Sequence, residues 1–297
     1  MKTQTFGALL GSAILVSLAL ACERGDSPAA PTATSAAAAS RINGSAVHSG
    51  VSADADREES GGCTKGTLEG AYGFYRSGTE SGAPVAAIGL ATFDGTGAVA
   101  TARQTLRRNG VTTSDLFATP PAAGPYEVNP NCTGKLFNSD GSVLAHIVVV
   151  DGGKEVDFIS LAPSVTSVGV MKRVGDESCS NASLEGAYGF YRSGTRSGDP
   201  VAAISIGTFD GTGAVATASQ TVRRNGVTTS DLFVTPPAAG PYEVDRDCTG
   251  KFLNPDGSDL AHIVLVDGGK ELYFTSVAPG VTAVGVERKI SNHRDGF

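Results

Sequence analysis

The feature that most constrains this chain is an internal repeat. Residues 63–173 align without a gap to residues 179–289 at a constant offset of 116, and 82 of the 111 aligned positions are identical. The string TFDGTGAVATA, for example, begins at Thr92 and again at Thr208. This repeat is far longer than the roughly 20–50 residues of a solenoid unit. We therefore expect two copies of one whole domain, joined by Val174–Ser178.

Turn signals divide each copy into short runs that are typical of β-strands. Asn109-Gly110 and Asn225-Gly226 are the preferred dipeptide of a type I′ hairpin. Between the turns lie eight or nine β-branched or alternating runs, such as VAAIGLATF and VLAHIVVV. Local hairpins without a long crossover favour a barrel over a sandwich. The sequence predicts an all-β fold with two tandem antiparallel up-and-down β-barrels after a signal peptide and a disordered linker.

The first residues are typical of an export signal. Lys2 precedes an apolar run that ends in small residues before Cys22, and this run is too short for a membrane-spanning helix with its flanks. Cys22 directly follows Ala21, which resembles a bacterial lipobox in which the thiol is lipidated. The alternative is cleavage at an A-x-A site and a freely secreted protein. We expect a signal peptide at 1–21 and an anchored, extracytoplasmic protein of the cell envelope.

Residues 22–62 are rich in Ala, Ser, Thr, Pro and Asp and contain almost no large apolar side chain. Such a segment buries too little surface to offset its chain entropy. We expect it to be a disordered tether between the lipid and the first barrel.

Composition and charge exclude one class of partner. The net charge is −7, and the sequence contains no cluster of Lys and Arg that would form a basic face. Nucleic-acid binding needs such a face, because the phosphate backbone supplies most of the affinity. We therefore expect no nucleic-acid partner, and we expect the membrane, through the N-terminal lipid, and a small apolar ligand as partners.

The remaining four cysteines divide evenly between the copies. Cys63 and Cys132 belong to the first copy, Cys179 and Cys248 to the second, and both spacings are 69. In an exported chain an even number of cysteines per domain indicates disulfides. The repeat then favours one bridge within each copy. The alternative is a metal site, which has little support because no His lies near these cysteines in the sequence.

Differences between the copies suggest which side of each strand faces water. Val143 is replaced by Asp259, which predicts that Ala145, Ile147 and Val149 face out and that Leu144, His146, Val148 and Val150 face in. Asp157 is replaced by Tyr273, which predicts that Val156, Phe158 and Ser160 face in. Arg103 is replaced by Ser219, which predicts that Ala98, Ala100, Ala102, Gln104 and Leu106 face in. A β-bulge would invert each assignment beyond it.

Six side chains are candidates for binding a ligand, and each also has a structural explanation. They are Tyr75, Gln104 and His146 in the first copy and Tyr191, Gln220 and His262 in the second. An inward histidine would bind or protonate a ligand, but it is more often a satisfied polar group of the core. The tyrosines are more often packing residues. Arg76 and Arg192 have two interpretations: they would hold an acidic head group, or they lie at a solvated hairpin end. We favour the hairpin end.

The sequence contains no motif that identifies a catalytic centre. G-x-S-x-G, H-E-x-x-H, P-loop and C-x-x-C motifs are absent, and no copy contains two histidines. No catalytic residue is therefore assigned, and neither a cofactor nor a metal is expected.

The strings LEGAYGFYRSG, TFDGTGAV, GPYEVNPNCTGKL and VVVDGGKE resemble a group of secreted bacterial domains with allene-oxide-cyclase-like or calycin-type small barrels. The resemblance covers each whole repeat and rests on glycines, turns and the pattern Y-x-V-x-x-x-CTG. It implies an eight-stranded antiparallel barrel with an apolar cavity. Members with catalytic activity cyclise a bound substrate mainly by shaping it, but no position here matches a catalytic motif.

Three functions are consistent with these features. The first is an exported, lipid-anchored tandem barrel that binds a small apolar ligand or an envelope or extracellular partner. The second is a cyclase or isomerase that acts on an apolar substrate, and the third is a structural module of the envelope. The size and lining of the barrel interior would distinguish them, because a ligand site needs roughly 300 Å³ or more.

Overall fold

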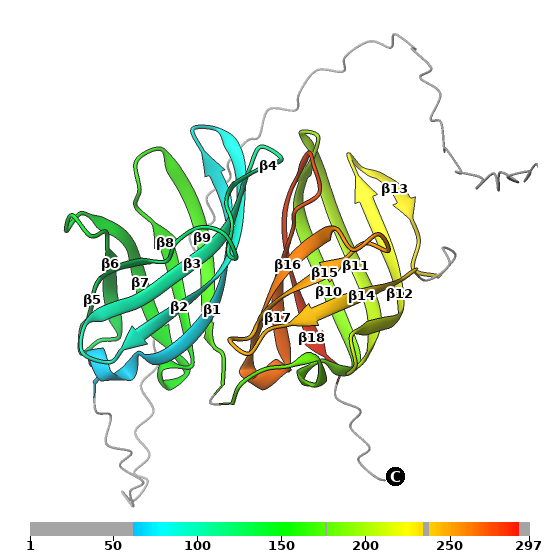
Figure 1. Ribbon diagram of the computed structural model, residues 1–297. Coiled ribbons are helices and arrows are strands. Elements are labelled where there is room, and N and C mark those ends of the chain that lie inside the picture. The colour runs from blue at the N-terminus through cyan, green and yellow to red at the C-terminus, as the bar shows by residue number, and fades with distance from the viewer. Residues whose placement is uncertain (1–61, 176, 234–237, 291–297) are drawn as a thin grey trace, which may run out of the picture. The chain divides into compact units, whose positions relative to one another are not determined.

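A computed structural model describes residues 62–175, 177–233 and 238–290 and shows an all-β fold with two closed antiparallel barrels (Figure 1). Each barrel has eight strands in its ring and a ninth, short strand outside the ring. Barrel 1 contains β1 (Glu69–Glu80), β2 (Ala83–Asp94), β3 (Ala98–Arg108), β4 (Val111–Ser114), β5 (Ala122–Val128), β6 (Thr133–Phe137), β7 (Val143–Val150), β8 (Glu155–Ser160) and β9 (Val165–Arg173). Barrel 2 contains β10 (Glu185–Arg196), β11 (Asp199–Asp210), β12 (Ala214–Arg224), β13 (Val227–Ser230), β14 (Ala238–Val244), β15 (Thr249–Leu253), β16 (Asp259–Val266), β17 (Glu271–Ser276) and β18 (Val281–Lys289).

Each barrel closes through the pairing of its second and third strands. The order in barrel 1 is β2-β1-β9-β8-β7-β6-β5-β3, and β2 also pairs with β3. β4 pairs only with the far end of β3, so it extends a hairpin beyond the ring. Barrel 2 repeats this arrangement with β10 to β18. The predicted up-and-down barrels are therefore confirmed.

The Asn-Gly turns have the expected backbone. Asn109 has φ 47° and Gly110 has φ 80°, and the values at Asn225 and Gly226 are 46° and 78°. Positive φ at both central residues defines a type I′ turn, whose twist matches that of the strands on either side. These dipeptides thus fix the β3–β4 and β12–β13 hairpins.

Disulfides form within each copy, as the repeat predicts. Cys63 bonds to Cys132 and Cys179 to Cys248, with Cα–Cα separations of 4.9 Å in both. Because disulfides persist in oxidising compartments, the two bonds indicate an extracytoplasmic location. Each bond ties the start of a copy to the residue before its sixth strand.

One end of each barrel is closed by buried aromatic side chains. In barrel 2 the Tyr188 hydroxyl donates to the Gly269 carbonyl oxygen at 2.7 Å, and the Tyr242 hydroxyl donates to the Leu184 carbonyl oxygen at 3.0 Å. The ring of Phe209 lies between the two tyrosines, with centroids 5.1 and 5.2 Å away. Because their hydroxyls are bonded, these buried tyrosines close the barrel end without an unsatisfied polar group.

Barrel 1 closes with the equivalent set. Its tyrosines are Tyr72 and Tyr126, whose hydroxyls donate to the Gly153 and Leu68 carbonyl oxygens at 2.5 and 2.9 Å. Phe93 lies between them. The closed end is therefore a common feature of the two copies.

The predicted pleat of β7 is wrong. Ala145, Ile147 and Val149 are 3%, 2% and 5% exposed and belong to the core, whereas His146 and Val148 face out. The cause is a bulge: Phe137 pairs with Val143 but Leu136 pairs with Ala145, so the register shifts between them. Beyond the bulge every side chain lies on the opposite face from the one that Asp259 suggests.

A second bulge limits the prediction for β3. Thr92 pairs with Thr101 and Phe93 with Val99, so Ala98 and Ala100 are exposed and Val99 is buried. Ala102, beyond the bulge, packs against the core as expected. In β8, which has no bulge, the prediction is confirmed, because Val156 and Ser160 are buried and Phe158 packs against the core.

The two barrels contact each other through unlike faces. In barrel 1 the outer side of β2 is covered, and Ala86, Ile88 and Leu90 belong to the same apolar cluster as Val264 and Val284 of barrel 2. β2 is therefore buried on both faces. The equivalent strand β11 alternates between buried and exposed residues.

Residues 1–61 lie outside the described ranges. The predicted signal peptide, the lipidation of Cys22 and nearly all of the predicted tether fall on them and stay predictions. Within the described residues, the structure contains no helix with the length and apolarity needed to span a membrane.

Candidate functional site

Barrel 2 encloses a cavity of about 460 Å³. Its rim is formed by the β10–β11, β12–β13, β15–β16 and β17–β18 hairpins, and its deeper wall is aromatic. The wall residues are Phe190, Phe209, Phe252 and Phe274. The volume lies within the roughly 300–1,000 Å³ of small-molecule sites, which are mostly apolar with a few polar groups.

A glycine-to-serine difference between the copies helps to open this space. In barrel 1 a Cβ on Gly89 would lie 2.3 Å from Cζ of Phe74, so the Phe74 ring lies directly against that glycine. Barrel 2 has Ser205 at this position, and its hydroxyl donates to the Ser219 carbonyl oxygen. A side chain here occupies the space that the Phe74 ring has in barrel 1. The Phe190 and Phe274 ring centroids lie 5.6 Å apart, against 6.3 Å for the aligned pair Phe74 and Phe158 in barrel 1.

The polar side chains that line the cavity include Arg192 from β10, Gln220 from β12 and Glu287 from β18. The other polar lining residues are Arg196, Ser205, Arg224, Thr229, Asn254 and Ser276. Glu287 is 6% exposed, and burial raises the pKa of its carboxyl to about 8. The carboxyl is therefore protonated and neutral at pH 7. Burial also lowers the pKa of the Arg192 guanidinium, with a smaller contribution from the nearby charge of Arg196, but an arginine remains charged.

The candidate residues from the sequence fall in three places. Gln220 lines the cavity of barrel 2, and Gln104 is half-buried at the equivalent position of barrel 1. Tyr75, His146 and Tyr191 instead line an open apolar groove of about 570 Å³ between the outer faces of the barrels. Burial raises the pKa of Tyr75 to about 12, and its ring packs on Tyr273 at 4.8 Å between centroids.

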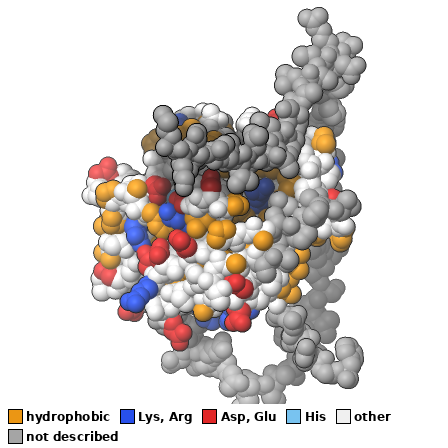
Figure 2. Space-filling view, turned by 45° about the vertical axis from the view of Figure 1, so that its right-hand side comes forward, with side chains coloured by type: hydrophobic (Ala, Val, Ile, Leu, Met, Phe, Trp, Pro, Cys, Tyr) orange, Lys and Arg blue, Asp and Glu red, His pale blue; other side chains and the backbone are white. Residues whose placement is uncertain are grey.

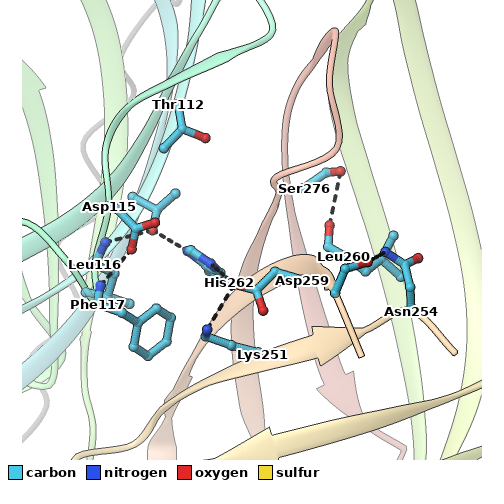
Figure 3. Close-up of polar contacts among 12 residues, drawn as sticks. Thr112, Asp115, Leu116, Phe117, Lys251, Asn254, Asp259, Leu260, His262 and Ser276 are labelled. Carbon is cyan, nitrogen blue, oxygen red and sulfur yellow. Dashed lines mark hydrogen bonds and ion pairs between the residues drawn. The ribbon is translucent and has the colours of Figure 1, made fainter. Parts of the chain in front are cut away.

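His262 occupies a third place, at the contact between the barrels (Figure 3). Its Nδ1 lies 2.6 Å from the Thr105 hydroxyl of barrel 1, and its Nε2 lies 3.2 Å from an Asp259 carboxylate oxygen. The Phe117 ring of barrel 1 meets it edge to face at 4.8 Å between centroids. Burial lowers the pKa of His262, whose side chain joins the barrels rather than entering the cavity.

The sequence interpretation missed Glu287 and placed Arg192 at a solvated hairpin end, which is wrong because Arg192 lines the cavity. A signal for Glu287 was present in the repeat. The aligned residue of the first copy is Met171, which is 4% exposed and part of the core of barrel 1. An acid at a position where the other copy buries a methionine indicates an unusual interior.

Neither the charge distribution on the face shown in Figure 2 nor the metal-ligating side chains of the described residues indicate a second site. On the face shown in Figure 2, hydrophobic, acidic and basic side chains are interspersed. Among residues 62–175, 177–233 and 238–290, no three His, Cys, Asp or Glu side chains cluster as metal ligands would.

Comparisons with known proteins give no family. No protein-family model matches the chain, and no curated protein matches it. One solved structure, described as the crystal structure of CghA, aligns with 76% of this chain and 89% of that chain at 11% identity, with a TM-score of 0.22. A match at this TM-score carries no argument about fold or function.

Proposed function

We propose that this protein is an exported, lipid-anchored tandem barrel that binds a small, largely apolar ligand inside barrel 2. The observation that carries the proposal is the cavity of about 460 Å³ with four phenylalanine rings on its wall. Such a space excludes water from apolar surface when a hydrocarbon body enters it, which is the dominant favourable term in this kind of binding.

The closed aromatic end supports the same proposal. Tyr188, Phe209 and Tyr242 seal one end, so a ligand enters from the rim of hairpins and stops at a rigid floor. A preformed, rigid cavity lowers the ordering cost of binding.

The test uses the neutral apolar dye N-phenyl-1-naphthylamine and the mature chain. Saturable binding with one dye per chain is expected. Val222→Phe, which fills the cavity, should weaken binding at least tenfold, whereas Leu106→Phe at the matched position of barrel 1 should not. Circular dichroism checks folding, and Val222→Leu, which introduces the residue of the first copy, is the milder variant.

Two outcomes would reject this function. One is the absence of saturable binding to the folded wild-type chain. The other is unchanged dye affinity in folded Val222→Phe, which would place the dye elsewhere.

Anchoring is tested separately at Cys22. Cys22→Ser should move the protein from the membrane fraction to the soluble extracytoplasmic fraction. Continued membrane association would contradict lipidation at this residue and leave the ligand site untouched.

A further inference from the structure

The cavity of barrel 2 holds a cation without a partner. Arg192 makes no hydrogen bond or ion pair with any residue that the structure describes, and its Nε is buried without an acceptor. In barrel 1 the aligned Arg76 donates from Nη1 to the Ser167 hydroxyl at 3.3 Å. Barrel 2 has Ala283 in place of that serine, so the acceptor is lost.

Arg192 is only partly buried, but its Nε–H is buried, and a buried donor without an acceptor is costly because it loses water without gaining a partner. Arginine presents its donors in a planar fork that matches an anionic acceptor such as a carboxylate. A bound anion would therefore remove the cost and satisfy the buried Nε.

The acid in the cavity does not supply that anion. Glu287 lies opposite Phe190 on the neighbouring strand, and Arg192 lies opposite Gly285, so the two side chains are diagonal neighbours about 7–8 Å apart at Cα. No hydrogen bond or ion pair joins the Glu287 carboxyl to Arg192 or to any other described residue. As a neutral acid at pH 7, it presents a donor to a ligand and no opposing charge.

A third difference between the copies lies at the rim. Arg196 lines the cavity where the first copy has Glu80. In barrel 1, Glu80 pairs with Arg108 at 3.1 Å. In barrel 2, Arg196 adds a positive charge at the entrance, and a basic entrance attracts an anion and repels a cation.

The cavity thus combines an apolar wall with a cation that lacks an anionic partner. We propose that the ligand of barrel 2 is an amphipathic carboxylate, whose head group binds the Arg192 guanidinium and whose apolar body packs on the phenylalanine rings. This inference rests on the proposed function, because it assigns the head group of the ligand that the cavity takes. Barrel 1 serves as the matched control. There the Ser167 hydroxyl already accepts a hydrogen bond from Arg76, and Met171 stands at the position of Glu287.

The experiment compares three probes with the same ten-carbon chain at pH 7. Decanoate, 1-decanol and decylammonium each compete with N-phenyl-1-naphthylamine for the mature chain. Decanoate should bind roughly tenfold or more tightly than decanol, as a charged hydrogen-bonded pair implies. Decylammonium should bind more weakly than decanol.

Variants assign the preference to one residue. Arg192→Met should abolish the advantage of decanoate over decanol, whereas Arg76→Met should keep the advantage. Ala283→Ser, which restores the acceptor found in barrel 1, should reduce the advantage. Arg192→Lys keeps the positive charge but loses the planar guanidinium, and it should retain part of the advantage of decanoate over decanol. Thermal unfolding confirms that each variant is folded.

The outcomes separate this inference from the function on which it rests. Equal binding of decanoate and decanol to wild type, or an unchanged preference in folded Arg192→Met, would overturn the carboxylate proposal while the apolar site stands. Failure of all three probes to displace the dye, or failure of the dye itself to bind, would overturn the proposed function.

Discussion

Barrel 1 and barrel 2 share 82 of 111 aligned residues but place the same residues in different surroundings. His146 is exposed on barrel 1, whereas His262 is 1% exposed at the contact between the barrels. The interiors also differ. In barrel 1 Met171 belongs to an apolar core, whereas in barrel 2 the aligned Glu287 lines a cavity together with Arg192, which has no hydrogen-bond or ion-pair partner among the described residues. The comparison teaches that the common framework depends on turns, disulfides and the aromatic floor, while a few interior substitutions create the site.

The largest expected difference between the barrels is the pH dependence that Glu287 gives to barrel 2. Its pKa is about 8 in the fold against 4.5 ordinarily, which corresponds to roughly 5 kcal/mol between the two protonation states. The folded state binds the proton more tightly, so stability is lost as pH rises from 4.5 and the loss is complete above about 8.

Glu287→Met should therefore stabilise barrel 2 by several kcal/mol at pH 9 and by little at pH 4. Hydrogen exchange of barrel 2 peptides, followed by mass spectrometry, measures the change. The reciprocal Met171→Glu should import the same pH dependence into barrel 1. A flat difference across pH in both variants would show that Glu287 is not buried as described.

The disulfides should matter about equally in the two barrels. Each closes a loop with a sequence separation of 69, and the loop-entropy model gives about 4 kcal/mol for a loop of this length. Paired serine substitutions at Cys63 and Cys132, or at Cys179 and Cys248, should lower the free energy of unfolding of their own barrel by about this amount. Urea unfolding, followed by peptide-resolved exchange, checks it. A large effect of one pair on the other barrel would contradict their local role.

Substitutions of His262 and His146 should differ in their effect on stability, by less than the disulfides contribute. His262→Gln leaves the Thr105 hydroxyl at the contact with an altered partner and should cost about 1–3 kcal/mol, whereas exposed His146→Gln should stay within about 0.5 kcal/mol. Because burial lowers the pKa of His262, the unfolded chain binds the proton more tightly. Wild-type stability should then fall as pH drops below 6.5, and His262→Gln should lose that component. Thermal unfolding between pH 5 and 8 tests both statements.

The smallest difference is expected at the Asp94 and Asp210 turns, where the copies are identical. Hydrogen bonds from the hydroxyl of the threonine two residues on, and then from backbone N–H groups, hold the pKa of both carboxyls well below the usual range. Their contribution is present above the ordinary pKa near 3.8 and disappears as pH falls toward the folded value. Alanine at either position should give small and equal decreases in melting temperature. Unequal decreases would show that the turns are not equivalent.

Local features of the fold were predictable from the sequence because they depend on neighbouring residues. Asn109-Gly110 requires a turn with positive φ, and the matched cysteine spacing favours one bridge per copy. Which face of β7 is buried was not predictable, because the bulge at Val143 depends on its pairing with Phe137 on another strand.

The candidate site was only partly predictable for a similar reason. Gln220 was predictable from the pleat, but Glu287 was not among the candidates, because all six are residues that the copies share and Glu287 aligns with Met171. Tyr75 and Tyr191 lie on outer faces, and no local pattern reveals that a second barrel covers them. The informative positions were those where the copies differ in polarity at a buried position, such as Met171 and Glu287.

The contact through unlike faces bears on how such a chain arises. A two-fold dimer buries the same patch on both subunits, so its fusion would cover β2 and β11 alike. Here Ile88 is fully buried, whereas its counterpart Ile204 is 56% exposed. The two copies thus have different selective constraints at identical positions. A substitution on the outer side of β11 should change stability little, while the same substitution on β2 should destabilise the packing of both barrels. Divergence should therefore accumulate faster on the outer side of the second copy's β11 than on that of β2.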